Sequence, residues 1–180
     1  AAVWSGDNQA KDEHILLGAL LINQMGLSGV PFTGPDLGGY IGDGGPATQA
    51  RINSPSRVAV DGDGNVYIMD TYNQRVRKVL VSNQTITTVA GNGIIAFSGY
   101  GILATTTSIN EANGVAVDAG GNIYIADSFN QRIRMVTAGT ITTIAGTGGL
   151  GYGGYNFEET ATQALLNYPY SVTTTTGAIY

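Results

Sequence analysis

The stretch "NSPSRVAVDGDGNVYIMDTYNQRVRK" (residues 53–78) decides the fold, because the chain contains it twice. Fifty-seven residues further on the sequence reads "NEANGVAVDAGGNIYIADSFNQRIRM" (110–135), and 14 of the 26 aligned positions are identical. A third copy begins at the same spacing, since "ATQALLNYPYSV" (161–172) lies two periods after "ATQARINSPSRV" (47–58). A period of this length indicates a repeat architecture and governs how every shorter motif is interpreted.

Each copy has the pattern of four short strands. In the first copy, alternating residues 58–60 precede the turn sequence "DGDGN" (61–65), and "VYI" (66–68) follows it. "RVRKV" (75–79) alternates again, with its arginines expected on one side and its valines on the other, and "TITTVA" (85–90) closes the set. Four antiparallel strands at a fixed period, joined by Gly- and Tyr-rich connections, predict a mainly β protein built of β-propeller blades.

The repeats predict an incomplete propeller. We expect complete blades near 57–90 and 114–145 and a partial blade at 171–180. Because propellers typically have at least about four blades, the sequence is expected either to be a fragment or to obtain blades from other chains. Unpaired edge strands would make self-association through open blade edges physically possible.

The repeated residues resemble NHL repeats. The resemblance lies in "VAVDGDGNVYIMDTYNQRVRKV" and "VAVDAGGNIYIADSFNQRIRMV", followed by "ITTVAGNG" and "ITTIAGTG", and it covers about residues 40–180. It implies a propeller that binds proteins or other ligands on one face and is only occasionally an enzyme. It also implies an extracellular or periplasmic protein of bacterial type.

Residues 1–42 are predicted to form a separate segment, which shows no trace of the 57-residue period before Tyr40. Asp12 and Glu13 stand where the first turn of a helix favours acidic residues, and Gly26 is placed to end that helix. The apolar residues between them recur at helical spacing: Leu16, Leu17, Leu20, Leu21 and Met25. With "GVPFTG" after the helix, the segment is predicted to be strand, helix and strand.

This first segment resembles the catalytic barrel of glycoside hydrolase family 31. The resemblance rests on "WSGDN" (4–8) and "GPDLGGY" (34–40), two motifs at the separation found in that family. It implies that Asp7 is the general acid/base of a retaining α-glucosidase or α-xylosidase. It also implies that Trp4 and Tyr40 line a sugar subsite and that Asp36 supports it.

Hydrolysis is nevertheless not expected. A retaining glycosidase requires a second carboxylate as nucleophile, and by the resemblance that residue would lie upstream of Ala1. A (β/α)₈ barrel also needs about 250 residues. Tyr40 to Gly42 fit both patterns, so a chimera of the two families, natural or artefactual, is a further hypothesis. The preferred interpretation is a binding or assembly module; a glycosidase fragment and a structural subunit completed between chains remain alternatives.

The composition of the chain limits the classes of partner that it is expected to bind. Eight Lys and Arg against 13 Asp and Glu give a net charge of -5, which disfavours nucleic acid. No apolar run is long enough to predict a membrane span, and no metal or cofactor site is expected. In "DGDGN" a hairpin turn is favoured over a calcium loop, since Val66 stands where such a loop needs glycine. A protein or carbohydrate ligand remains possible.

Charged residues recur in both copies. A binding face is one interpretation, but recurrence in every blade favours pairing between neighbouring strands. The residues concerned are Asp70, Arg75 and Arg77 in the first copy and Asp127, Arg132 and Arg134 in the second.

Overall fold

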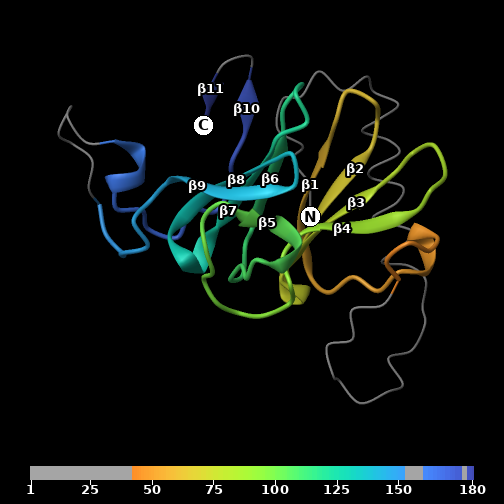
Figure 1. Cartoon of the computed structure of the whole chain (residues 1–180), viewed down its shortest axis with the longest axis horizontal. Coiled ribbons are helices and arrows are strands. Elements are labelled where there is room, and N and C mark those ends of the chain that lie inside the picture. The colour runs from red at the N-terminus through yellow and green to blue at the C-terminus, as the bar shows by residue number, and fades with distance from the viewer. Residues whose placement is uncertain (1–41, 153–159, 176–177) are drawn as a thin grey trace.

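The computed structural model of the chain describes residues 42–152, 160–175 and 178–180. Within these ranges the protein consists of two antiparallel sheets and the start of a third unit (Figure 1). The sheets are side by side through their first strands, β1 (Pro55–Val60) and β6 (Gly114–Val117). This arrangement confirms the mainly β prediction.

Each sheet is an up-and-down meander that corresponds to one copy of the repeat. The first contains β1, β2 (Val66–Asp70), β3 (Arg75–Val79) and β4 (Ile86–Ala90) in that order. The second contains the corresponding strands in the same order: β6, β7 (Ile123–Asp127), β8 (Arg132–Thr137) and β9 (Thr140–Ala145). In the third copy, β10 (Thr174–Thr175) pairs with β11 (Ala178–Ile179).

The outer edge of each sheet is covered by the connection that leads into it. In the second sheet a fifth strand, β5 (Ile102–Leu103), pairs with β9, and in the first sheet Pro46 forms an isolated bridge with Thr85. A short 3-10 helix follows each of these contacts, η1 (Ala47–Gln49) and η3 (Ala104–Thr106). Covering an edge in this way leaves few backbone groups open to unwanted pairing.

The hairpin between β1 and β2 is closed by its own side chains. The Asp61 carboxylate accepts the backbone N–H groups of Asp63 and Asn65 and the hydroxyl of Tyr67. Asp118 makes the same contacts to Gly120, Asn122 and Tyr124 in the second sheet. The "DGDGN" stretch is therefore a hairpin turn, as expected.

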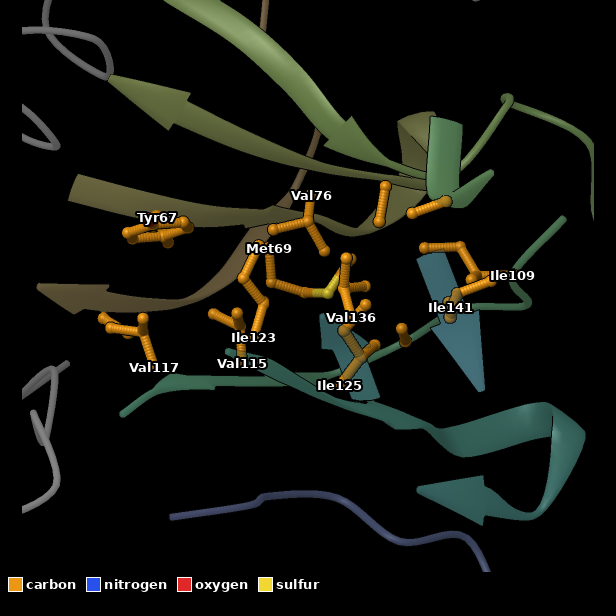
Figure 2. Packing of buried hydrophobic residues seen from close by; sticks show 14 residues of the cluster. Tyr67, Met69, Val76, Ile109, Val115, Val117, Ile123, Ile125, Val136 and Ile141 are labelled. Atoms are coloured by element: carbon orange, nitrogen blue, oxygen red, sulfur yellow. The ribbon is translucent and has the colours of Figure 1, made fainter. Parts of the chain in front are cut away.

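The main core lies between the two sheets (Figure 2). Tyr67, Met69 and Val76 of the first sheet face Val115 and Ile125 of the second, among other apolar residues. Val79, by contrast, belongs to a separate cluster on the other face of the first sheet. The expectation that β3 directs its arginines to one side and its valines to the other is therefore wrong: strand alternation puts Arg77 and Val79 on one face and Val76 on the opposite face.

No helix among the described residues is long and apolar enough to cross a membrane.

The hairpin carboxylates predict an acid-sensitive contribution to stability. Burial alone would raise the pKa of Asp118, but hydrogen bonds from Asn122, Tyr124 and the Gly120 N–H hold it below its ordinary value. A depressed pKa stabilises the folded state above the unfolded pKa of about 3.9, and this contribution is lost as the pH falls through the folded value. We expect Asp118→Asn to lower the free energy of unfolding by about 1 kcal/mol at pH 7.

Denaturant titrations at several pH values provide the test. The deficit of Asp118→Asn should shrink towards zero as the pH falls below the ordinary aspartate pKa of about 3.9 and through the lowered folded-state pKa of Asp118, because the wild-type carboxyl then also becomes neutral. Asp63→Asn, at the exposed tip of the equivalent hairpin, is the control and should change little at any pH. A deficit that is independent of pH would contradict the assignment.

Candidate functional site

A buried carboxylate lies at the end of the second strand of each blade. Asp70 is 0% exposed, and its oxygens accept the backbone N–H of Asn53 at 2.7 Å and the side-chain amide of Asn73 at 2.9 and 3.1 Å. Arg77 Nη1 lies 3.5 Å from the same carboxylate. The group thus connects the segment before β1, the turn after β2 and strand β3. Burial raises the pKa of Asp70, and these hydrogen bonds and the guanidinium oppose that effect.

The second blade repeats this arrangement. Asp127 accepts the Asn110 N–H at 2.9 Å and the Asn130 amide at 3.0 Å, and Arg134 Nη1 lies 3.5 Å away. Both Asp127 and Arg134 are 0% exposed. Burial raises the pKa of Asp127, again opposed by these partners.

The guanidinium groups differ between the blades in their outer contacts. Arg77 forms a second ion pair with Asp43 at 2.9 Å, whereas Arg134 donates to the Gly99 carbonyl at 2.7 Å. The ring of Phe97 lies 4.9 Å from the guanidinium carbon of Arg134 and 3.8 Å from that of Arg132. An aromatic face at this distance attracts a desolvated cation.

Arg75 and Arg132 bind backbone carbonyls in equivalent places. Arg75 donates to the carbonyls of Asn73 and Asn92, and Arg132 to those of Asn130 and Thr147. Each arginine therefore ties the turn after the second strand to the connection after the fourth. Because the Asp–Arg pairs are fully buried and the other arginines bind backbone, we infer that all six repeated charged residues have a structural role.

A second recurring contact joins each blade to the next. Gln74 and Gln131 have left-handed backbone conformations, with φ of 53° and 54°, at the end of the turns η2 (Thr71–Asn73) and η4 (Ser128–Asn130). The side-chain oxygen of Gln74 accepts the Glu111 N–H at 2.7 Å, and that of Gln131 accepts the Tyr168 N–H at 2.6 Å. Both glutamines occur in the repeated "NQR", but the repeat alone did not predict that they connect the blades.

Exposed aromatic side chains gather at the end of the blades where these turns lie. Tyr72 and Phe129 are 59% and 48% exposed within the two turns, and Tyr168 and Tyr170 are 47% and 63% exposed in the connection that precedes β10. Phe129 and Tyr168 make an edge-to-face contact at 5.1 Å, and the guanidinium of Arg57 lies 5.9 Å from the ring of Tyr170. We call these five residues the aromatic end.

Hydrogen bonds between blades hold the aromatic end in place. Thr71 donates to the Ala112 carbonyl at 3.0 Å, and Ser128 donates to the Pro169 carbonyl at 2.7 Å. Each turn that carries an aromatic ring is therefore fixed to the next copy of the repeat. Rigidly held aromatic rings beside a guanidinium form a surface suited to planar or sugar-like ligands and to protein contacts.

The residues predicted from the glycosidase resemblance, Trp4, Asp7, Asp36 and Tyr40, lie outside the described residues. No cluster of metal-binding side chains occurs in residues 42–152, 160–175 and 178–180. The described part of the chain thus offers a framework of buried charges and one aromatic surface.

Two family models match the chain. Residues 1–57 match the glycosyl hydrolases family 31 TIM-barrel domain, and residues 53–79 and 110–134 match the NHL repeat. The two matches meet at residues 53–57, just where β1 begins. Residues 44–47 already take part in the first blade, since Gly44 donates to the Ile86 carbonyl and Ala47 to that of Gln84.

Curated relatives fall into the same two groups. The chain is 31% identical over 100 residues to NHL repeat-containing protein 2 of Bos taurus, covering 54% of this chain and 14% of that protein. It is 50% identical over 40 residues to alpha-glucosidase 2 of Bacillus thermoamyloliquefaciens, covering 22% of this chain and 5% of that protein. The chain therefore spans only a small part of either relative.

A solved structure supports the fold. An auxiliary nutrient binding protein of Bacteroides ovatus matches with a TM-score of 0.52 and 20% identity, covering 67% of this chain and 32% of that one. The described sheets are thus blades of a β-propeller. The chain carries NHL repeats of this fold, preceded by a segment similar to the family 31 barrel.

The burial of the Asp–Arg pairs predicts that removing one partner greatly lowers the free energy of unfolding. Arg134→Met leaves the Asp127 carboxylate without its cation in a buried site, and breaking such a pair typically costs about 3–5 kcal/mol. Urea denaturation followed by circular dichroism would measure this loss. Arg51→Met, at an exposed position, is the matched control and should change stability by less than about 0.5 kcal/mol. Equal effects of the two substitutions would contradict a structural role for the pair.

Proposed function

We propose that the chain is an NHL-type propeller module that binds a ligand at its aromatic end, in an extracellular or periplasmic setting. The observation that carries the proposal is the set of four exposed aromatic rings at one end of the blades, where Phe129 contacts Tyr168 and Arg57 lies beside Tyr170. Scattered exposed aromatics are common on soluble proteins. Tyr72 and Phe129 instead occupy equivalent turns, and hydrogen bonds to the next copy anchor those turns.

A carbohydrate is the ligand class that we favour. Aromatic rings stack on the apolar faces of sugar rings while hydroxyl groups and a guanidinium bind their polar edges. The names of the relatives agree with this choice, since one is an alpha-glucosidase and a structural neighbour is a nutrient binding protein. An α-linked glucose oligosaccharide is therefore the first probe to use.

Titration calorimetry with maltoheptaose tests the proposal. We expect binding with a Kd on the order of 0.1 mM, as for a small polar contact surface. Tyr170→Ala should weaken it about tenfold or more, since it removes a ring worth about 1.5 kcal/mol from the surface. Tyr152→Ala removes an exposed ring outside the aromatic end and should leave the affinity unchanged.

Two results would count against the proposal. Absence of heat with maltoheptaose would exclude an α-glucan ligand, and equal weakening by Tyr152→Ala and Tyr170→Ala would exclude the aromatic end as the site. If the chain bound a protein ligand instead, and Tyr170→Ala abolished that binding, the aromatic end would still be the binding site. Only the proposed ligand class would then be wrong.

A catalytic role is the second candidate, because residues 1–57 match the family 31 barrel. In that case Asp7 would act as general acid/base, with Trp4, Asp36 and Tyr40 around the sugar. Release of 4-nitrophenol from its α-glucoside is the measurement. Release of 4-nitrophenol that the Asp7→Asn substitution abolishes would establish a glycosidase activity. We expect the unsubstituted chain to release no more 4-nitrophenol than the Asp7→Asn variant does.

A further inference from the structure

We propose that Glu111 is a ligand-binding residue of the aromatic end, and that its carboxylate accepts hydrogen bonds from the hydroxyl groups of an α-glucan that lies across the exposed rings. This role rests on the proposed function, because it adds a polar contact to the same surface. Glu111 lies shortly before β6, the first strand of the second blade, and its side chain is half-buried.

The backbone at Glu111 has an unusual conformation that recurs in each copy of the repeat. Its φ is 40°, in the left-handed region, and the residues one period away on either side, Ser54 and Tyr168, have φ of 48° and 46°. None of the three is a glycine, the residue that adopts such angles without steric cost. Other residues keep this conformation only where their surroundings impose it, and they are found most often at functional sites.

Side chains of the neighbouring turns hold Glu111 in this conformation. Its N–H donates to Gln74 Oε1 at 2.7 Å, and its carbonyl accepts the side-chain amide of Asn113 at 2.9 Å. Asn113 also donates to the hydroxyl of Ser128 at 3.0 Å. Both polar groups of the Glu111 backbone are therefore bonded within the protein, and none of these contacts involves the Glu111 side chain.

The repeat places the Glu111 side chain beside an exposed ring. Tyr168 meets Phe129 edge to face, with ring centroids 5.1 Å apart. One period earlier the corresponding residues are Glu111 and Tyr72, and equivalent hydrogen bonds between blades fix both pairs, one from a backbone N–H to a glutamine and one from a hydroxyl to a carbonyl. Glu111 therefore lies beside Tyr72 in the place where Tyr168 lies beside Phe129.

The carboxylate of Glu111 is available to a ligand. Among the described residues, no hydrogen bond or ion pair uses it, although the N–H and the carbonyl of the same residue are both bonded. An ionised carboxylate only accepts hydrogen bonds, and the hydroxyl groups of a sugar can donate them. A sugar ring whose apolar face stacks on Tyr72 would bring its hydroxyl edge to Glu111.

Titration calorimetry of the full chain with maltoheptaose tests this role. Glu111→Gln keeps the size of the side chain and removes its charge, and we expect it to raise the Kd about tenfold, because neutral hydrogen bonds replace charge-assisted ones. The melting midpoint should not change. Asp63→Asn makes the same change of charge in the exposed hairpin between β1 and β2, away from the aromatic end, and should leave the Kd unchanged.

Glu111→Gly separates ligand binding from a purely structural role. Glycine adopts a φ of 40° without strain, so this variant should raise the melting midpoint by about 2–4 °C. It should nevertheless weaken the binding of maltoheptaose about tenfold or more, because the carboxylate is lost. A variant that melts higher and binds as tightly as the unsubstituted chain would show that the residue serves only the turn, and would overturn the proposal.

Tyr170→Ala distinguishes failure of this role from failure of the proposed function. If Tyr170→Ala weakened the binding of maltoheptaose and Glu111→Gln left it unchanged, the role of Glu111 would be overturned and the aromatic end would remain the α-glucan site. If the unsubstituted chain gave no heat with maltoheptaose, both would be overturned.

Discussion

The carboxylate at the end of the second strand is the group on which each blade depends. A buried carboxylate is tolerated only when donors surround it, and here the donors come from three separate segments. In the first blade they are the Asn53 N–H, the Asn73 amide and the Arg77 guanidinium. One charged group therefore fixes the entry to β1, the turn after β2 and the position of β3. The requirement for all three explains why the sequence keeps "D…NQR.R" together.

The turn that this carboxylate holds also links the blades and displays two of the aromatic rings. Its last residue, Gln74 or Gln131, reaches the backbone of the next copy, while its middle residue, Tyr72 or Phe129, is exposed. The proposed ligand surface is thus built on the same short turn that makes the framework rigid. A rigid support of this kind lowers the entropic cost of binding.

Much of the fold could be predicted from the sequence because the repeat exposes it. The four-strand pattern of each blade and the "DGDGN" turn follow from two aligned copies, whereas the recurrence of the charged residues favoured pairing between strands without showing which partners pair. The alternation in β3 was predicted wrongly because Arg77 is buried as completely as the valines, so hydropathy does not separate its two faces. The aromatic end was not foreseen: Tyr72 and Phe129 align, but Tyr168 and Tyr170 align with Glu111 and Asn113, so the surface depends on spatial proximity and not on repetition. The glycosidase residues belong to a part of the chain that the described structure does not include.

Native-state hydrogen exchange measured by NMR tests the central claim that these side chains, in addition to the sheets, hold the blades together. The amides of Asn110 and Glu111 lie outside every strand, and their partners are the side chains of Asp127 and Gln74. We predict that both exchange as slowly as the amides of the buried strand β6. Exchange at the rate of an exposed loop such as residues 82–84 would contradict the account.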